Sequence, residues 1–396
     1  MNEAAHTSRL SATMREGERV KPLELFFDLV FVLAITQCTA LMVQEHTWAG
    51  LGEAVLVLAL LWWAWTGYAW LTSVVDPEEG AVRIALIAAM AALLLVALAL
   101  PNAFDDRALE FALAYTAVRA AHIALFVVAS RDDPGLRQSV LGLAAGTAGG
   151  CALLVAGALF DTGPQVALWA LALAIDMAEP YFASAASWRL VPLHFAERHG
   201  LIVIVALGES IVALGVGADV GLTFGVAAAA ILGIALVSEL WWIYFDIVAI
   251  ANVRRLVNAP PGETRNAMAR DVYSYLHFPL VAGIIIAAFG LHDTLAHVKD
   301  PLDDVPAFAL VGGVAIYLFG HVALRLRGAR SVNWRRLLLG ALLLAMFPLA
   351  TAVASLAILA AITALLCGLI VIETRSYGEG RTRVRRAFDQ QDFELR

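Results

Sequence analysis

Long apolar runs separated by short polar segments occupy almost the whole chain. A membrane-spanning helix needs about 20 mostly apolar residues, and this pattern therefore predicts an all-α polytopic membrane protein with about twelve transmembrane helices. The last two runs form one continuous stretch in which only Pro348 suggests a break, so eleven spans remain an alternative. The predicted spans lie near residues 22–44, 50–74, 82–101, 108–130, 138–160, 165–184, 195–216, 222–250, 272–292, 306–327, 335–349 and 351–373.

Short polar segments flank and separate these runs, and the longest predicted loop covers residues 251–271. Residues 1–21 contain no apolar core ahead of a cleavage site, so we interpret the run at 22–44 as an uncleaved signal anchor. We expect 1–21 to be a cytoplasmic N-terminal segment and 374–396 to be a basic cytoplasmic tail.

Basic residues are distributed very unevenly between alternate loops. If there are twelve spans and the N-terminus is inside, 24 Lys and Arg residues lie inside, whereas only Arg107 and Lys299 lie outside. Cytoplasmic segments of membrane proteins carry such an excess of basic residues. The pattern predicts a multi-pass protein of the cell membrane, inner or plasma, with both termini in the cytoplasm.

Three short motifs recur in the same order along the chain. Glu24 and Glu197 each open a span, Trp62-Trp63 corresponds to Trp241-Trp242, and His122-Ile-Ala-Leu corresponds to His321-Val-Ala-Leu. The offsets of 173, 179 and 199 residues rise along the chain, as loop insertions would make them. We therefore predict two parallel six-helix repeats, over 22–184 and 194–373.

Composition agrees with a membrane environment and narrows the chemistry. Hydrophobic residues make up 61% of the chain and charged residues 15%, whereas soluble domains carry about 25% charged residues. Cys38, Cys151 and Cys367 lie within apolar runs and form no CxxC pair, which argues against a disulfide framework or a zinc site. There is also no nucleotide-binding loop, so we expect no cofactor, no metal and no nucleic-acid partner.

Ionisable residues inside the predicted spans are the candidate functional groups, since each costs at least about 2.5–3.5 kcal/mol to insert. Glu24 and Asp28 are four residues apart and share one helical face at the cytoplasmic end of the first span. Two such carboxylates could bind a cation or hold a proton. They could equally pair with an Arg or with backbone donors and fix the packing.

Further carboxylates lie in later spans. Glu209 follows Gly208, and a small neighbour lets an ion or another backbone approach the carboxylate. Glu209 could instead hydrogen-bond to a Ser or Thr across a helix contact, and Asp176 and Glu239 could line a polar cavity. His194, Glu197 and His199 do not form an HExxH motif, so a zinc hydrolase is not favoured.

Arg119 and His122 lie three residues apart on one face of the fourth predicted span. An Arg stays charged in proteins, so Arg119 needs a carboxylate and is interpreted as a structural counter-charge. The available partners are Asp28, Asp176, Glu209 and Glu239. His122 could titrate near neutral pH, although its counterpart His321 suggests a packing role that both share.

The first predicted span, Glu24-Leu-Phe-Phe-Asp-Leu-Val-Phe-Val-Leu-Ala-Ile35, resembles the opening signature of the bacterial low temperature requirement protein A family. Glu197-Arg-His-Gly-Leu201, followed by Leu207-Gly-Glu-Ser210, is similar to the second signature of that family. The resemblance covers nearly the whole chain. It implies a bacterial multi-pass membrane protein whose family takes its name from a requirement for growth in the cold.

The same span is also similar to the first-helix motif of the lysosomal potassium channel family and its bacterial relatives. That family has six helices per repeat, and its first helices line a cation pore. The resemblance implies that Phe26 and Asp28 hold the first helix against its neighbours. The second half departs from the motif. Glu197 matches Glu24 of the first half, but no Phe-x-Asp follows it.

Three functions remain open from the sequence. The first is a cation or proton channel or transporter that uses Glu24, Asp28, Asp176, Glu209, Glu239 and His122, with Phe26 and Glu197 tethering helices. The second is a membrane enzyme or carrier acting on a lipid or a small amphipathic molecule, and the third is a non-catalytic sensor or assembly factor. A catalytic role is not favoured. The partners expected are the lipid bilayer and a monovalent cation or proton, and a homodimer is left open.

Overall fold

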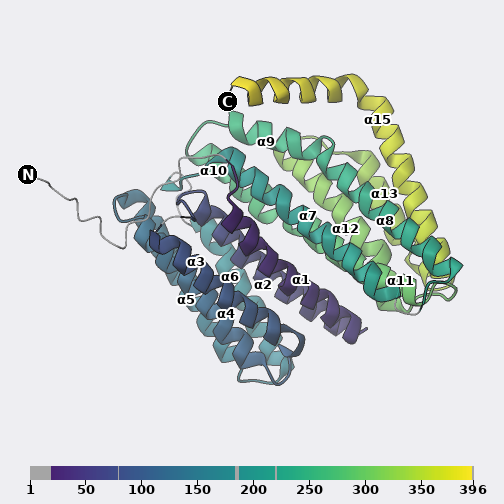
Figure 1. Cartoon of the computed structure of the whole chain (residues 1–396), viewed down its shortest axis with the longest axis horizontal. Coiled ribbons are helices and arrows are strands. Elements are labelled where there is room, and N and C mark those ends of the chain that lie inside the picture. The colour runs from purple at the N-terminus through teal and green to yellow at the C-terminus, as the bar shows by residue number, and fades with distance from the viewer. Residues whose placement is uncertain (1–18, 79, 183–186, 219–220, 395–396) are drawn as a thin grey trace, which may run out of the picture. The chain divides into compact units, whose positions relative to one another are not determined.

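The computed structural model describes residues 19–78, 80–182, 187–218 and 221–394, with side chains up to residue 376. Most of the predicted N-terminal segment 1–21 therefore lies outside the described residues. The described chain is helical and contains no strand (Figure 1). Its helical elements are α1 (Pro22–Gln44), α2 (Trp48–Thr72), α3 (Gly80–Ala99), η1 (Leu100–Asn102), α4 (Ala108–Ala129), α5 (Pro134–Gly157), α6 (Thr162–Phe182), α7 (Pro192–Gly217), α8 (Phe224–Phe245), α9 (Val248–Asn258), α10 (Glu263–Met268), η4 (Ala269–Tyr275), α11 (Phe278–Ala296), α12 (Asp304–Ala329), α13 (Trp334–Ala345), α14 (Phe347–Ala350) and α15 (Ser355–Glu394).

Ten of the described helical segments are long and apolar enough to cross a membrane. The all-α polytopic fold predicted from the apolar runs is thus confirmed. Two further predicted spans correspond to α6, which has 21 residues, and to α13, which has 12. Because a helix rises about 1.5 Å per residue, α13 alone is too short for the roughly 30 Å of hydrocarbon in a bilayer.

Several helix boundaries differ from those predicted. The predicted span 222–250 is divided between α8 and α9, which are separated at Asp246 and Ile247. Much of the predicted loop 251–271 is helical, so the expectation of a long loop was wrong. The loop is reduced to a turn at Pro260, Pro261 and Gly262, where Gly262 has a φ of +89°.

The chain divides into two compact units. Unit 1 comprises 1–38, 56–198 and 260–267, and unit 2 comprises 39–55, 199–259 and 268–396. The repeats predicted over 22–184 and 194–373 stay a prediction.

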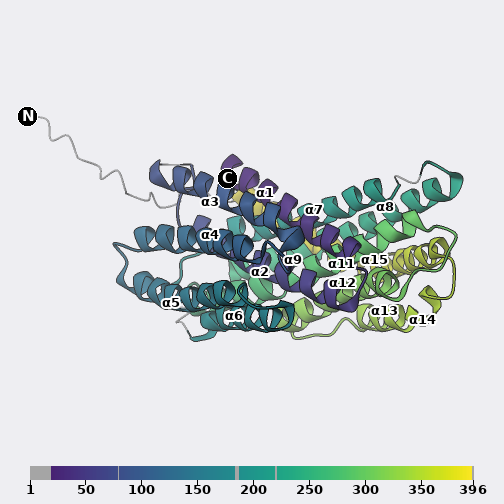
Figure 2. The ribbon, with the colours of Figure 1, turned by 90° about the horizontal axis from the view of Figure 1, so that it is seen from below.

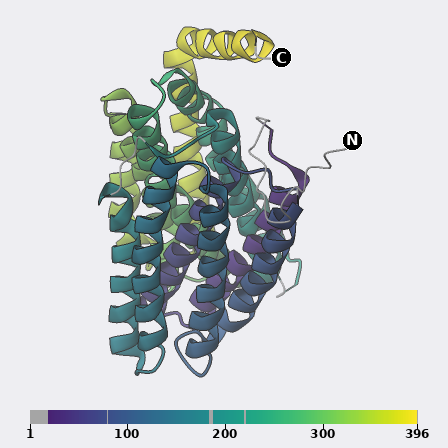
Figure 3. The same ribbon diagram turned by 90° about the vertical axis from the view of Figure 1, so that its left-hand side faces the viewer.

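In unit 1, α3, α4, α5 and α6 run side by side in chain order (Figures 2 and 3). Asp133 begins α5, because its side chain accepts a hydrogen bond from the backbone N–H of Leu136 at 3.1 Å. This bond and the Arg189 guanidinium hold the pKa of Asp133 below its ordinary value. Gly146 and Gly150 on α5 then allow α6 to approach closely, at Glu179 and at the backbone of Ala172.

In unit 2, α11 and α12 are in close contact along most of their length. A Cβ atom placed on Gly290 would lie 2.4 Å from the backbone nitrogen of Leu310, and one on Gly283 would lie 2.7 Å from the Gly313 carbonyl oxygen. Glycine therefore sets the spacing of this pair. α15 packs on α8, and its C-terminal part bends away from the rest of the helix in Figure 1.

Many large apolar side chains are exposed on the membrane-spanning helices. On α3 they include Ile84, Ile87, Leu95 and Leu98. Apolar patches of this kind are rare on soluble monomers, and they suit contact with lipid chains. These exposed side chains therefore support contact between the helices and the lipid bilayer.

Candidate functional site

A buried cluster of ionisable side chains lies in unit 1, where the N-terminal ends of α1 and α7 meet the C-terminal end of α2. Arg198 on α7 donates from Nη1 to Glu24 Oε1 at 3.0 Å and from Nη2 to Asp28 Oδ1 at 2.6 Å. Both carboxylates come from one face of α1, as their spacing of four residues predicts. One guanidinium thus binds two carboxylates, and all three side chains are buried.

His194 extends this cluster one turn before Arg198 on α7. Its Nε2 lies 2.8 Å from Glu24 Oε1, so the two groups share a hydrogen bond. Its Nδ1 lies 3.1 Å from Ser73 Oγ. Because both His194 and Glu24 are fully enclosed, a proton shared between them is shielded from bulk water. We refer to Glu24, Asp28, His194 and Arg198 as the Arg198 cluster.

Side chains of α2 add further hydrogen bonds to the Arg198 cluster. Trp65 Nε1 donates to Asp28 Oδ1 at 2.8 Å, and the Trp65 ring also lies 5.6 Å from the Arg198 guanidinium carbon. Thr72 Oγ1 accepts from Arg198 Nη1 at 3.0 Å. Among the described residues, Asp28 Oδ2 and Arg198 Nε make no hydrogen bond. The cluster therefore retains one acceptor and one donor for a proton, a water molecule or a ligand.

Two contacts join the start of α1 to the same end of unit 1. Lys21 Nζ forms an ion pair with Asp76 Oδ2 at 2.7 Å. The backbone N–H of Val20 donates to Glu197 Oε2 at 3.2 Å. Glu197 thus contacts the segment that leads into α1, which is compatible with the tethering role predicted for it.

A second buried ion pair joins α4 to α6 in unit 1. Arg119 Nη2 lies 2.8 Å from Asp176 Oδ2, and Thr147 Oγ1 on α5 accepts from the same nitrogen at 2.8 Å. Thr147 in turn donates to Asp176 Oδ1 at 3.1 Å. Of the four carboxylates that the sequence left open as partners of Arg119, the structure brings Asp176 to it.

α2 contacts both buried clusters of unit 1. Its Trp65 side chain binds Asp28, whereas the backbone carbonyl of Trp63 accepts from Arg119 Nη1 at 3.5 Å. The Trp65 side chain and the Trp63 carbonyl thus link α2 to both groups of buried charges.

His122 is enclosed one turn from Arg119, between α4 and α2. Its ring packs against Tyr68 and Phe126, with ring centroids 5.3 Å and 5.1 Å apart. A Cβ atom on Gly67 would lie only 2.8 Å from the imidazole carbon Cε1. Gly67 is therefore the residue that makes space for this histidine.

The remaining predicted site residues lie elsewhere. Glu209 is buried on α7, eleven residues after Arg198, and Glu239 is half-buried on α8. Phe26 is 56% exposed, whereas Phe27 and Phe31 are the aromatic residues of α1 that are buried. The tethering role of Phe26 and the path roles of Glu209 and Glu239 stay predictions.

An apolar groove lies between α4 and α5 in unit 1. Its volume is about 840 Å³, and small side chains such as Ala120, Ala148 and Ala152 line it. Thr147 also lines the groove and hydrogen-bonds both members of the Arg119–Asp176 pair. The groove thus combines a largely apolar wall with the Thr116 and Thr147 hydroxyls, of which Thr147 contacts the buried ion pair.

The two central members of the Arg198 cluster on α7 were not among the residues selected from the sequence. In the sequence, Arg198 fits the excess of basic residues on the cytoplasmic side, and His194 belongs to a segment that does not match a zinc motif. A signal was available, because His194 and Arg198 are four residues apart at the start of an apolar run. That spacing matches the spacing of Glu24 and Asp28 and places complementary groups on one helical face.

The sequence was compared with known families, curated proteins and solved structures. The family model described as "Bacterial low temperature requirement A protein (LtrA)" matches residues 19–371. An uncharacterized protein of Rhizobium meliloti (strain 1021) is 30% identical over 370 residues, which cover 89% of this chain and 88% of that protein. No solved structure matches.

Proposed function

Because this chain belongs to the bacterial low temperature requirement A family of membrane proteins, we propose that its buried ion-pair cluster carries protons in a multi-pass transporter. In this proposal Glu24 and His194 hold the transported proton, and a monovalent cation is the ion exchanged for it or moved with it. The observation that carries the proposal is the 2.8 Å contact between His194 Nε2 and Glu24 Oε1, two fully buried side chains.

The balance of charge within the Arg198 cluster supports proton binding. Its four side chains comprise two carboxylic acids, one permanently charged guanidinium and one imidazole. With the imidazole neutral and both carboxylates ionised, these four groups sum to one negative charge. A buried net charge is costly, and one proton on His194 or on a carboxylate removes it. The cluster can therefore alternate between two protonation states that differ in electrostatic free energy.

The position of Arg198 favours a proton over a metal cation at this point. A potassium or sodium ion that bound Glu24 and Asp28 would have to displace a guanidinium that is 3.0 Å from one carboxylate and 2.6 Å from the other. A proton needs no such rearrangement, because it can move along an existing hydrogen bond. We assign the Arg119–Asp176 pair a structural role and keep His122, Glu209 and Glu239 as further candidates for the path.

The direct test is ion flux from liposomes that contain the purified protein and an enclosed pH-sensitive dye. Gradients of protons, potassium and sodium are imposed in turn. We expect the internal pH of wild-type liposomes to change under at least one gradient. His194→Gln and Glu24→Gln should each lower the rate at least tenfold, because each removes a group that exchanges the proton.

The matched control is Asp133→Asn, which breaks an ion pair with Arg189 that lies outside the spans and should leave flux unchanged. Size-exclusion profiles establish that each variant remains folded. Folded wild-type protein that moves neither protons nor cations under any gradient would refute the proposal. That outcome would favour a sensor or assembly role, in which the paired carboxylates only hold α1, α2 and α7 together.

A second candidate function is supported by the groove between α4 and α5. Largely apolar walls with few polar groups suit an acyl chain or another amphipathic molecule, so the protein would act as a carrier for such a ligand. Ala148→Trp should fill the groove and abolish binding of a fluorescent fatty acid. Ala145→Trp is the matched control, since Ala145 is exposed on the same helix and does not line the groove. Equal binding by wild type and both variants would exclude this function.

A further inference from the structure

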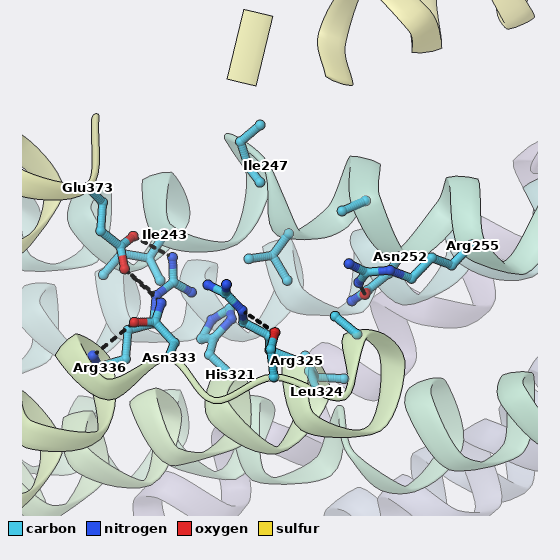
Figure 4. Close-up of a pocket in the computed structure, with 14 residues that line it drawn as sticks. Ile243, Ile247, Asn252, Arg255, His321, Leu324, Arg325, Asn333, Arg336 and Glu373 are labelled. Atoms are coloured by element: carbon cyan, nitrogen blue, oxygen red, sulfur yellow. Dashed lines mark hydrogen bonds and ion pairs between the residues drawn. The ribbon is translucent and has the colours of Figure 1, made fainter. Parts of the chain in front are cut away.

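A cavity of about 300 Å³ lies within unit 2, remote in sequence from the Arg198 cluster (Figure 4). It is formed by the end of α8, by α9, by the C-terminal half of α12 and by the segment that leads into α13, with α15 at one side. Since water occupies about 30 Å³ per molecule in the liquid, this space corresponds to roughly ten water molecules. It is large enough for a small polar group together with several waters.

Basic side chains outnumber acidic ones in this cavity. Arg255, Arg325 and Arg336 line it, and Glu373 is the acidic residue among the residues that line it. Arg336 and Glu373 already satisfy each other in a two-pronged ion pair, with distances of 2.8 Å and 3.1 Å. Glu373 Oε1 also accepts a hydrogen bond from Asn333 Nδ2 at 2.9 Å. The Glu373 carboxylate thus neutralises Arg336, and no further acidic side chain of the described residues lines the cavity to pair with Arg255 and Arg325.

Arg255 and Arg325 have only neutral partners among the described residues. Arg255 donates to Asn252 Oδ1 at 3.3 Å, and Arg325 donates to Ser331 Oγ at 3.0 Å. Both guanidiniums line the same cavity. Figure 4 shows Arg325 beside His321 in the middle of the view. Asn252 and Arg255 lie to the right of them, and Arg336 and Glu373 lie to the left. Each Arg has five N–H donors, so most of these donors are available to a ligand.

Two buried side chains add further unused polar atoms to the same wall. Both ring nitrogens of His321 and the Nδ2 of Asn252 make no hydrogen bond within the described part of the chain, although the two residues are 2% and 4% exposed. A buried donor without a partner costs about 1–3 kcal/mol. Since a neutral imidazole donates from one nitrogen and an amide donates from Nδ2, a ligand with several acceptor oxygens would satisfy both.

We propose that this cavity binds the phosphate group of an anionic ligand. Phosphate offers oxygens that match the planar donor fork of Arg, and two guanidiniums and two neutral donors line this cavity. Ile243, Ile247 and Leu324 line the remaining wall and suit the glycerol and first acyl carbons of a phospholipid. Basic pockets between membrane helices bind phospholipid headgroups in this way. A free phosphate has the same recognised chemistry and is the alternative source.

This site is independent of the proton proposal. None of its residues belongs to the Arg198 cluster or to the Arg119–Asp176 pair. A failure of proton flux would therefore leave the phosphate site untouched, and the reverse also holds.

The test uses the full-length protein, purified in detergent and freed of lipid, with two probes. One probe is phosphatidylglycerol, compared with phosphatidylcholine, and binding is counted by native mass spectrometry. The other is inorganic phosphate, and binding is followed by the midpoint of thermal unfolding. We expect one saturable site per chain for at least one probe. Arg255→Gln combined with Arg325→Gln should weaken that binding at least tenfold.

The control is Arg330→Gln, which removes an exposed charge at the end of α12 from a side chain that does not itself line the cavity. Its affinity should equal that of the wild type. If the double variant does not fold, Ala251→Phe fills the cavity without changing its charge and should abolish the same binding. Saturation by lipid alone identifies a headgroup site, and saturation by phosphate alone identifies a soluble ligand. The proposal is wrong if neither probe saturates, or if the control loses as much affinity as the cavity variants.

Discussion

Arg198 is the side chain that joins α1, α2 and the first turns of α7 within unit 1. It contacts Glu24 and Asp28 on α1 and Thr72 on α2 from its own position on α7. Removing one partner of a buried ion pair leaves the other charge without compensation, which typically costs about 3–5 kcal/mol. The cluster therefore concentrates much of the stability of α1 in one guanidinium.

The substitution Arg198→Met should destabilise the folded protein by about 3–5 kcal/mol, because it leaves two carboxylates buried without a cation. Adding Glu24→Gln and Asp28→Asn to the same chain should restore part of this loss, since both residual charges disappear. Thermal unfolding in detergent measures the difference. Arg189→Met is the control, because it breaks an exposed pair with Asp133 that is worth at most about 1 kcal/mol. An Arg198→Met protein as stable as the control would contradict this assignment.

Sequence reasoning found one side of the Arg198 cluster and missed the other. Glu24 and Asp28 were recognisable because carboxylates inside an apolar run are costly and rare. Arg198 was not, because an Arg at the end of a span also fits the ordinary excess of cytoplasmic basic residues. Only the packing of α7 against α1, across 170 residues of sequence, separates these two interpretations. The choice of Asp176 among four possible partners of Arg119 likewise depends on which helices meet.

At the scale of elements, glycine determines how closely α11 and α12 pack. Gly283 and Gly290 on one helix face Gly313 and Leu310 on the other, with backbone atoms where a side chain would otherwise be. In lipid, association of helices relies on van der Waals packing and close backbone approach. The contact is consequently sensitive to a single methyl group.

The substitution Gly290→Ala should destabilise unit 2 by about 1–3 kcal/mol, since overpacking of a tight contact has that cost. Its Cβ would meet the Leu310 backbone, which cannot move aside as a flexible side chain can. Gly368→Ala on α15 is the matched control, because no atom lies within 4 Å of the added Cβ. The control should be neutral or slightly stabilising, as Ala favours a helix over Gly. Equal unfolding midpoints for the two variants would show that α11 and α12 are not held by this contact.

The apolar runs predicted most of the helices but not their internal breaks. Runs such as 50–74 and 306–327 appear as single helices, α2 and α12, because nothing in them interrupts the apolar pattern. The separation of α8 from α9 at Asp246 was missed, since the apolar residues continue on both sides. The π-helical turns of η4, between Ala269 and Tyr275, were also missed. Such turns depend on local packing around the backbone and leave no pattern of period 3.6.

At the scale of the whole molecule, the distribution of basic residues predicts the orientation of every span. It places Lys299 outside and Arg330 inside, at the two ends of α12. Both side chains are exposed in unit 2. This orientation and the placement in the cell membrane are predictions, as is the relation between the two six-helix repeats.

Cysteine labelling tests the orientation directly. In a background where Cys38, Cys151 and Cys367 are replaced by Ala, Lys299→Cys should react with a membrane-impermeant maleimide on intact cells. Arg330→Cys should react only after the membrane is opened, because the positive-inside rule places it in the cytoplasm. The reverse pattern would invert the topology. Labelling of both positions on intact cells would mean that α12 does not cross the membrane.

The pairing of Glu24 with Arg198 also has a consequence for biosynthesis. The two residues are 174 positions apart, and a ribosome adds about 5–20 residues per second. Glu24 is therefore synthesised roughly 9–35 s before the arginine that neutralises it. During that interval the carboxylates of α1 must be protonated, remain near the headgroups or stay within the insertion machinery. Stable docking of the first helix thus waits for the seventh, and nascent chains truncated before α7 should be recognised as incomplete by membrane quality control.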